Sequence, residues 1–474
     1  MVVGEISQNR EVVIIGGGPG GYHAAIRAAQ HGLAVTLIEQ KGLGGTCLHE
    51  GCIPSKLWAY VAKEFVGIPQ LAALGIQTNT PTLHINQLHQ YKMNIVEQLK
   101  KGVQTLCEAN QIEVLKGKAS FLAEDRIGVE NGHQFDTYTF EKAIIATGCE
   151  YVLPAQFHIG SNHIYCSSEI YQLNELPNHV LVHGNDFIAI EVASVFADLG
   201  SKVTFLLTAD DFPFDVPLQK ELTRICKKKK IKLIKGADIK SVVETNAGLH
   251  VIYKSKHGEV AVQVSHLYTS GIKKVNKEWL GIDRLHMQMT EDGSIAVNEK
   301  FETSVHHILA IGDVIDGPPL AVRAIKEGKH VAHMLANESS ECDFTFLPTV
   351  IHSNPPIVTV GLTEKEATTY GYEAKSTTFP LQGNGFRTLT GKREGIISVV
   401  VDVKTDIILG MHMIGEGAVE LSSTFVQLLE MVAKVEDVTF PNYAHPSVNE
   451  SLLEVLEAMT GYAIHVPPRV KTKA

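Results

Sequence analysis

A complete βαβ pattern near the N-terminus constrains the fold of this chain more than any other feature. Residues 11–15 (EVVII) form a short apolar run that is typical of a buried parallel strand. The glycine-rich loop 16–21 follows at once, and an alanine-rich helix is expected over residues 22–31. A second apolar strand over residues 34–38 ends at Glu39. Strand, loop, helix, strand and acid in this order predict a dinucleotide-binding unit.

The residue types in this unit are those that a dinucleotide requires. Gly16, Gly18 and Gly21 fill the pattern G-x-G-x-x-G, in which the missing side chains let the backbone approach a pyrophosphate at a helix N-terminus. Glu39 lies 18 residues after the last glycine, where a carboxylate can bind the two hydroxyls of a ribose. The glycine pattern alone would be weak evidence, but here the flanking strands, helix and acid all agree with it.

Two cysteines, Cys47 and Cys52, follow directly after this unit in the run GGTCLHEGCIPSK. A disulfide needs its two Cα atoms within about 7 Å, whereas five residues of straight helix rise about 7.5 Å. We therefore expect a local distortion, for which Gly51 and Pro54 provide the means. The pair could be a structural bridge, half of a metal site or a redox disulfide. A metal site would need ligands besides His49, so a redox disulfide is favoured.

Composition excludes several classes of function. The 474 residues are enough for about three domains, and the net charge of −10 argues against nucleic-acid binding. Five further cysteines are scattered along the chain, as in a reducing compartment where a disulfide is catalytic. No secretion signal or membrane-spanning apolar run is found, so we expect a cytoplasmic enzyme. A disulfide beside a bound dinucleotide suggests flavin chemistry.

A second βαβ pattern repeats this layout, with strands expected over residues 180–182 and 202–207 and a helix between them. Its glycine pattern is incomplete, because Gly184 is retained but Asp186 and Ala189 stand at the other two positions. A carboxylate at position 186 would lie where a pyrophosphate binds, and like charges a few Å apart repel strongly at low effective dielectric. We therefore expect the fold of a nucleotide-binding unit with a damaged fingerprint.

The ribose-binding signal is also missing from this second unit. Its second strand ends at Leu207 rather than at an acid, and Asp210 and Asp211 lie too far along the chain to be good substitutes. No arginine is placed to bind a 2′-phosphate. We expect weak binding of any nicotinamide dinucleotide here.

Two other predicted strands run into residues suited to a ligand. The strand at 142–145 leads into Ala146-Thr147-Gly148, whose small residues permit close approach of the backbone. The strand at 307–311 leads into Gly312 and Asp313, and this aspartate can accept a hydrogen bond from a ligand hydroxyl. A simple helix cap is the alternative for Asp313. A long helix is expected over residues 85–109.

Beyond about residue 350 the pattern changes to alternating strands and helices, which predicts an α+β domain with an antiparallel sheet. Near its end, His445 precedes a helix that begins after a proline and carries Glu450 in its first turns. A carboxylate that orients a histidine makes it a better base, although a structural histidine at a helix start fits the spacing equally well. The expected elements are strands over 357–360, 396–401 and 408–414 and helices over 418–434 and 448–460.

Four blocks carry a resemblance to a known family: GGGPGG with Glu39, GGTCLHEGCIPSK, AIGD at 310–313, and AHP at 444–446 with Glu450. The chain resembles the dihydrolipoamide dehydrogenases, a branch of the flavin-linked pyridine nucleotide–disulfide oxidoreductases, over essentially its whole length. CIPSK, rather than CVPKK, is similar to the lipoamide branch and not to the glutathione branch. The chain has no extra C-terminal cysteine pair of the kind that marks mercuric reductases.

This resemblance implies an α/β fold with two Rossmann-like nucleotide-binding domains and a C-terminal α+β dimerisation domain. It implies that Cys52 lies next to the flavin, that Cys47 exchanges with substrate, and that His445, paired with Glu450, deprotonates the incoming dithiol. The histidine would come from the partner subunit of a homodimer. The residues implied to bind FAD are Gly16, Gly18, Gly21, Glu39, Gly45, Thr46, Lys56, Ala119, Thr147, Gly148, Asp313 and Ala321.

The resemblance also implies a division of the chain and a route for electrons. The expected segments are an FAD-binding part (1–149), an NAD-binding-like part (150–276), a second FAD-binding or central part (277–347) and a dimerisation part (348–474). Gly184, Glu191 and Gly271 are the candidate NAD residues, although the family run G-R-x-P-N reads GIKKVN here. No metal, nucleic acid or membrane is expected as a partner.

Three functions remain open at this point. The first is oxidation of dihydrolipoamide, such as the lipoyl groups of a 2-oxo acid dehydrogenase complex, through Cys47–Cys52 and FAD to NAD. The second is a flavin disulfide oxidoreductase that has lost efficient use of NAD(H) and works with another donor or acceptor. The third is a binding or assembly subunit without activity, against which the retained cysteines, Lys56, His445 and Glu450 argue.

Overall fold

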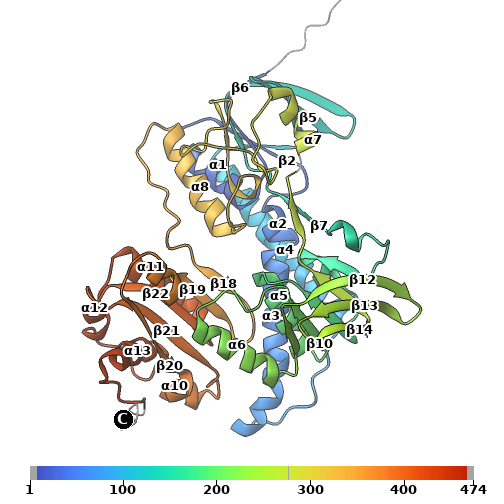
Figure 1. Cartoon of the computed structure of the whole chain (residues 1–474). Coiled ribbons are helices and arrows are strands. Elements are labelled where there is room, and N and C mark those ends of the chain that lie inside the picture. The colour runs from blue at the N-terminus through green and yellow to red at the C-terminus, as the bar shows by residue number, and fades with distance from the viewer. Residues whose placement is uncertain (1–7, 276, 467–474) are drawn as a thin grey trace, which may run out of the picture.

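The computed structural model describes residues 8–275 and 277–466. Figure 1 shows three packed groups of elements, two built around mainly parallel sheets and one around an antiparallel sheet. This arrangement confirms the expected fold class of two Rossmann-like units followed by an α+β domain. Across the described residues, no helix is both long and apolar enough to cross a bilayer.

The first sheet has the strand order β3-β2-β1-β6-β5-β4, with β17 beside β6. Strands β1, β2, β3, β6 and β17 run parallel, whereas β4, β5 and β6 form an antiparallel meander. The strands are β1 (Gln8–Ile15), β2 (Val35–Glu39), β3 (Glu113–Lys116), β4 (Lys118–Ala123), β5 (Arg126–Asn131), β6 (Gln134–Ile145) and β17 (Ile308–Ala310).

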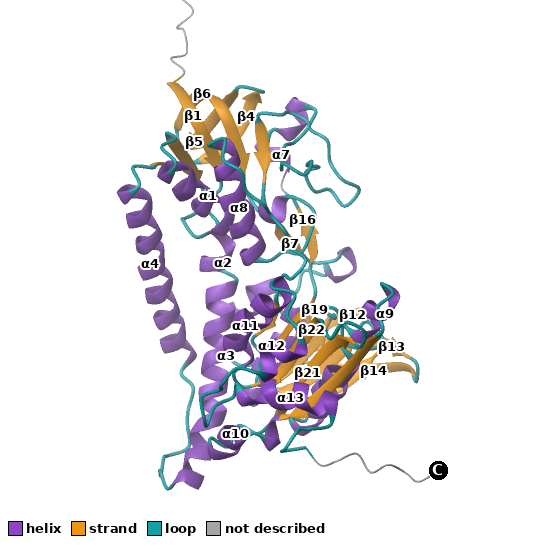
Figure 2. Ribbon diagram, turned by 90° about the vertical axis from the view of Figure 1, so that its left-hand side faces the viewer, coloured by secondary structure: helices purple, strands orange, loops and turns teal. Residues whose placement is uncertain are grey.

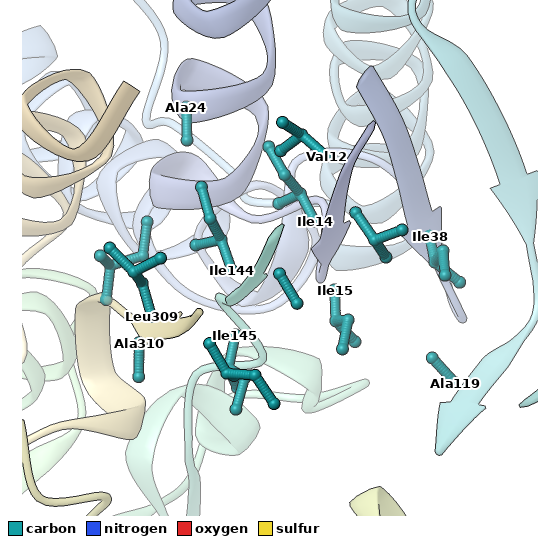
Figure 3. Close-up of a cluster of buried hydrophobic side chains, with 14 of the residues drawn as sticks. Val12, Ile14, Ile15, Ala24, Ile38, Ala119, Ile144, Ile145, Leu309 and Ala310 are labelled. Atoms are coloured by element: carbon teal, nitrogen blue, oxygen red, sulfur yellow. The ribbon is translucent and has the colours of Figure 1, made fainter. Parts of the chain in front are cut away.

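Buried aliphatic side chains from three neighbouring strands fill the core of this sheet. Ile14, Ile144 and Leu309 come from β1, β6 and β17, and Figure 3 shows them grouped beneath α1 (Pro19–Gln30). Helix α1 packs tightly on α8 (Ala321–Leu335), because both have glycine at the crossing: a Cβ on Gly328 would lie 2.4 Å from the Gly20 carbonyl oxygen. Glycine at this crossing therefore brings α1 and α8 into close contact beside the loop 16–18.

The expected βαβ unit is confirmed, with small shifts at its ends. Strand β1 begins at Gln8 and α1 begins at Pro19, a residue that suits the first turn of a helix because its missing N–H is not needed there. The long helix expected over residues 85–109 is α4 (Ile85–Ala109).

The second sheet is wholly parallel in the order β11-β10-β9-β15-β8. A three-stranded antiparallel sheet, β12-β13-β14, lies beside it, and β7 pairs with β16 to form a two-stranded connection. The elements are β7 (Glu150–Val152), β8 (Ile164–Cys166), β9 (His179–His183), α5 (Phe187–Asp198), β10 (Lys202–Leu207), α6 (Val216–Lys228), β11 (Lys232–Lys235), β12 (Asp238–Thr245), β13 (Gly248–Ser255), β14 (Gly258–Val264), β15 (His266–Thr269), β16 (Ile272–Lys274) and α7 (Lys277–Leu280).

The C-terminal sheet is antiparallel in the order β18-β19-β22-β21-β20, as expected for an α+β domain. Strands β18 and β20 were not predicted, because the first is short and the second lies between two turns. The elements are β18 (Thr349–Ile351), β19 (Ile357–Gly361), α9 (Glu364–Thr369), β20 (Ala374–Pro380), α10 (Gly385–Leu389), β21 (Gly395–Asp402), β22 (Ile408–Gly415), α11 (Ala418–Glu430), α12 (Val435–Thr439) and α13 (Glu450–Thr460).

Helix α6 joins the second sheet to the C-terminal one. Near its C-terminus, Lys228 Nζ lies 3.1 Å from Glu394 Oε1, and Lys229, the residue after the helix, pairs with Asp198. Ser398 Oγ on β21 donates to Asp215 Oδ2, just before α6, at 3.0 Å. These contacts fix the second unit against the C-terminal domain.

Candidate active site

Cys47 and Cys52 are joined in a disulfide. Cys47 lies in the short helix α2 (Gly45–His49), and Cys52 is the first residue of the next helix, α3 (Cys52–Gly67). Their Cα atoms lie 4.6 Å apart. Gly51, at φ −100° and ψ −99°, interrupts the helix between them and shortens the Cα–Cα separation below that of a straight helix. The predicted local distortion is therefore confirmed, and Figure 2 shows α2 below the first sheet with α3 continuing away from it.

The glycine loop of the first unit (residues 16–21) packs directly against the segment that carries the disulfide, and we call this loop the cradle. Gly16 has φ +105°, and a Cβ there would lie 2.4 Å from the Ala146 carbonyl oxygen. A Cβ on Gly45 would lie 2.7 Å from the Cα of Gly18, so the turn before Cys47 rests directly on the loop. Gly18, the residue before α1, provides no side-chain cap, and a Cβ on Gly21 would overlap the Gly16 carbonyl. The first N–H groups of α1 can therefore bind an anion.

Glu39 closes the other side of this cradle. Its Oε2 accepts a hydrogen bond from the Gly17 N–H at 2.7 Å, and its Oε1 accepts from Lys41 N at 2.6 Å and Gly42 N at 3.0 Å. A carboxylate has about four acceptor positions, so capacity for a ribose hydroxyl remains after these three bonds. The backbone bonds also fix the direction in which the carboxylate points.

Asp313 lies in the turn after β17, facing the loop that follows β6. Burial raises the pKa of Asp313, and nearby Lys273 and Arg323 partly oppose this shift. Cys149 Sγ lies 4.0 Å from Asp313 Oδ2, and the neighbouring Gly148 has φ +67° with open space where a Cβ would stand. A half-buried carboxylate beside a glycine with open space at its Cβ position is suited to a ligand hydroxyl.

The remaining predicted FAD residues surround the same end of the first sheet. Ala119 is buried in β4, Thr46 lies in α2, Thr147 follows β6, and Ala321 is the first residue of α8, which has no side-chain cap. Two uncapped helix N-termini, an oriented ribose-binding acid and glycines in close backbone contact fit the shape and charge of FAD.

Lys56, one turn into α3, connects the disulfide helix to the second unit. Its Nζ lies 2.9 Å from both carboxylate oxygens of Glu191 on α5, and Glu191 is only 1% exposed. Glu191 Oε1 also accepts the backbone N–H of His352 at 2.8 Å. Glu191 therefore lies beside the disulfide helix rather than in the glycine loop of the second unit. Burial, and then Lys56, lowers the pKa of His352.

We expect Lys56→Met to lower the free energy of unfolding by about 3 kcal/mol, because the buried Glu191 carboxylate would lose its cation. Urea unfolding in saturating FAD, followed by circular dichroism, measures this loss. Adding Glu191→Gln to the same variant removes the uncompensated charge and should restore most of the stability. A Lys56→Met protein as stable as the natural chain would contradict the assignment of this ion pair.

The second glycine loop is closed by one of its own side chains. Asp186 Oδ1 accepts the Ala189 N–H at 2.8 Å, which caps the N-terminus of α5, and Asp186 Oδ2 accepts a hydrogen bond from Ser270 Oγ. A Cβ on Gly184 would lie 2.0 Å from Ser270 Oγ, so the serine fills the space over that glycine. The carboxylate thus occupies the position where α5 would bind a phosphate.

The other predicted defects of this unit differ in weight. Ala189 is fully buried, and alanine is an accepted third residue of the motif, so this position need not be a defect. Leu207 is fully buried at the end of β10 and offers no ribose ligand. Lys273, near Gly271, donates to the Ile315 carbonyl at 2.8 Å, which ties β16 to the first unit. Asn276 lies outside the described residues.

His445 and Glu450 form the predicted pair at the start of α13. His445 Nδ1 lies 2.7 Å from Glu450 Oε1, and Glu450 Oε2 accepts the Ser447 N–H at 2.8 Å. The hydrogen bond to His445 lowers the pKa of Glu450. The His445 side chain is 80% exposed, and its Nε2 makes no hydrogen bond within the described part of the chain. The imidazole is therefore oriented by a carboxylate with one nitrogen facing outward.

Sequence reasoning missed the residues that hold these groups from a distance. Ser270 bonds to Asp186 across 84 residues, and Asn384 Nδ2 donates to the Ser447 carbonyl oxygen at 2.9 Å across 63 residues. Neither residue stands in a recognisable motif. A damaged glycine pattern with an aspartate at its second position could have suggested a helix cap, because aspartate is among the preferred capping residues.

Two family descriptions match the chain. Residues 10–328 match "Pyridine nucleotide-disulphide oxidoreductase", and residues 347–456 match "Pyridine nucleotide-disulphide oxidoreductase, dimerisation domain". The first match spans both parallel sheets, and the second spans the antiparallel one.

Individual proteins are similar over nearly the full length. The dihydrolipoyl dehydrogenase of Geobacillus stearothermophilus is 32% identical over 468 residues, which cover 98% of this chain and 99% of that protein. That of Halobacterium salinarum is 32% identical over 471 residues, covering 98% and 99%. A Cu(II) complex of the HOCl-induced flavoprotein disulfide reductase RclA from Escherichia coli superimposes with a TM-score of 0.85 at 25% identity, covering 95% and 99%.

Proposed function

The chain belongs to the pyridine nucleotide-disulphide oxidoreductase family, and we propose that it oxidises a dihydrolipoyl-type dithiol through the Cys47–Cys52 disulfide and FAD. The main support for this proposal is the position of the disulfide next to the glycine loop of the first unit. Gly45, two residues before Cys47, packs directly on Gly18 of that loop. The similar dihydrolipoyl dehydrogenases support the choice of dithiol.

The reacting groups require two copies of the chain. The match of residues 347–456 to a dimerisation domain supports a homodimer, in which the exposed His445 of one copy faces the disulfide of the other. Because His445 Nδ1 is held by Glu450, the tautomer with its proton on Nδ1 is favoured, and Nε2 is left as the base. A dithiol attacks only as a thiolate, so this base is needed near neutral pH.

The exchange then follows from thiol chemistry. His445 Nε2 takes a proton from the first thiol, whose sulfur attacks Cys47 and displaces Cys52 as a thiolate. The second substrate thiolate then attacks the substrate sulfur that is bonded to Cys47. The bond between that sulfur and Cys47 breaks, Cys47 leaves as a thiolate, and the substrate is released as a disulfide. FAD, when bound, supplies two-electron acceptance beside Cys52. Lys56 and Glu191 hold the helix that carries Cys52, so the thiolate stays next to that site.

A second candidate function concerns the electron acceptor. The family implies NAD, but the residues of the second unit do not fit a pyrophosphate, because Asp186 already caps α5 and adds a negative charge there. We therefore favour an acceptor or donor other than NAD(H) for the flavin. The dithiol half of the reaction is unaffected by this difference.

Anaerobic mixing separates these functions. We expect dihydrolipoamide to reduce, and so bleach, the bound flavin within the time of one catalytic turnover. NADH at the same concentration should reduce the flavin at least tenfold more slowly, because Asp186 blocks phosphate binding at the start of α5. Stopped-flow absorbance of the flavin band measures both rates. Equal reduction by NADH would contradict the second candidate, and lack of reduction by any dithiol would contradict the proposed function.

A further inference from the structure

Helices α1 and α8 lie side by side in the first unit (Figure 1). Near their starts, a Cβ on Gly20 would lie 3.1 Å from the Ala324 carbonyl oxygen. At their ends, the ring centroids of His31 and His333 are 4.7 Å apart. The helices therefore run in the same direction. The cradle lies at the N-terminal end of this helix pair, and the two histidines meet at the C-terminal end.

Glu338 bridges the two histidines. Its Oε1 lies 3.0 Å from His31 Nδ1, and its Oε2 lies 3.0 Å from His333 Nδ1. The ligand atoms that these three residues offer all lie within 4.8 Å of one another. Ligands bound to a tetrahedral zinc ion at about 2.0–2.2 Å are roughly 3.4 Å apart, so small movements of the side chains bring all three onto one ion.

The way in which both helices end fixes these positions. After α8, Asn337 has φ +59°, and the Glu338 N–H donates to the His333 carbonyl oxygen at 2.9 Å. This closure turns the chain back over the last turn of α8, which brings the Glu338 side chain to the histidine. Helix α1 ends in the same manner, because Gly32, with φ +86°, directly follows His31.

The electrostatic field at this place favours a cation. The carbonyl groups at the C-terminal end of each helix carry a partial negative charge, and two such ends meet here. The hydrogen bond with His333 lowers the pKa of Glu338, so this side chain is a carboxylate at neutral pH. One full negative charge therefore lies between two imidazoles, at the ends of two helix dipoles.

We propose that His31, His333 and Glu338 form a binding site for a divalent transition-metal ion such as Zn²⁺. Two imidazoles and a carboxylate are an established zinc ligand set, in which water fills the fourth position. Imidazole nitrogens suit such ions, whereas Mg²⁺ prefers oxygen ligands. The ion would link the C-terminal ends of the helices whose N-terminal ends face the cradle. No metal was expected from the sequence, because the two histidines are far apart in the chain and form no local motif.

Arg27 is a cation beside this site. Its Nη1 lies 3.0 Å from His333 Nε2, and this nitrogen accepts the hydrogen bond, because a guanidinium only donates. A metal at Nδ1 leaves the ring proton on Nε2, so Arg27 must then turn away. Arg27 Nε already donates to the exposed Gln30 Oε1 at 3.1 Å, which gives the side chain a partner outside the site.

Calorimetric titration of the FAD-bound protein with ZnCl₂ tests the proposal. The Cys47–Cys52 disulfide is kept oxidised, so these sulfurs do not bind zinc. We expect one ion per chain at this site and no binding of Mg²⁺. Loss of an outer partner of a metal ligand weakens binding about 10- to 100-fold, so loss of a ligand in Glu338→Gln or His31→Phe should weaken it at least as much. The phenylalanine retains a ring against His333.

Glu302→Gln is the matched control, because Glu302 faces only one histidine, His306, at 3.8 Å within the described residues. It should leave the titration with Zn²⁺ unchanged. Circular dichroism and flavin content show whether each variant is folded. Absence of zinc binding by the natural chain, or binding of equal strength in folded Glu338→Gln and His31→Phe, would overturn the proposal.

Arg27→Gln tests where the ion binds. Removing this positive charge should strengthen zinc binding by about tenfold, since like charges a few Å apart repel. Lys404→Gln makes the same change in net charge in the exposed turn between β21 and β22, and should leave zinc binding unchanged. Equal affinities of Arg27→Gln and the natural chain would contradict an ion at His333 Nδ1.

Discussion

Replacing His445 by asparagine should slow the reduction of the flavin by dihydrolipoamide by a factor of about 10² to 10⁴, the usual contribution of a general base. The asparagine amide can take the place of Nδ1 and keep the 2.7 Å hydrogen bond to Glu450, so the loop should keep its structure. What is removed is Nε2, which makes no other hydrogen bond in the described part of the chain. The measurement is the first-order rate of flavin bleaching at saturating dithiol.

The control for this prediction is a histidine–glutamate pair far from the disulfide. His306 is 87% exposed, and its Nδ1 lies 3.8 Å from Glu302 Oε2, so His306→Asn removes a similar group from the surface. Its rate should equal that of the natural protein. Raising the pH should partly rescue His445→Asn, because more of the substrate then reacts as thiolate without a base. A rate loss below tenfold would show that another group takes the first proton.

Local sequence patterns predicted the first unit and its cradle well. Strand, glycine loop and helix are specified by residues next to one another, and the close contacts of Gly16 and Gly18 follow from the same short run. The disulfide was also predictable, because Gly51 lies between the two cysteines and permits the break in the helix. Helix α4 matched its expected bounds, since its apolar period continues without interruption.

Features that depend on distant partners could not be predicted from sequence patterns. The aspartate in the second glycine loop was expected to repel a phosphate, but its capping of α5 and its bond to Ser270 became evident only in the folded chain. The weight given to Ala189 was too great, because a methyl group fits that buried position. The pairing of Lys228 with Glu394 depends likewise on the packing of α6 against β21.

The substitution Asp186→Gly should increase the affinity for NADH by about 100-fold. At an effective dielectric of about 20, two unit charges about 6 Å apart repel by about 3 kcal/mol, which corresponds to this factor. In the natural chain the Ala189 N–H donates to the Asp186 carboxylate at 2.8 Å, and the substitution frees this N–H for a phosphate. Replacing a capping aspartate by glycine costs only a few tenths of a kcal/mol, so the unit should still fold. Quenching of the intrinsic fluorescence by NADH gives the dissociation constant, and stopped-flow gives the rate of flavin reduction.

Two matched variants divide this effect into its parts. Asp186→Asn removes the charge but keeps an oxygen that can cap α5, so its gain in affinity should be smaller than that of the glycine variant. Asp125→Gly makes the same change in net charge at an exposed turn between β4 and β5 of the first sheet, and should leave NADH binding unchanged. Adding Leu207→Glu to Asp186→Gly supplies a carboxylate for the ribose and should strengthen binding further. If the natural chain already binds NADH as tightly as Asp186→Gly, the carboxylate does not block the site, and NAD becomes the acceptor that the structure favours.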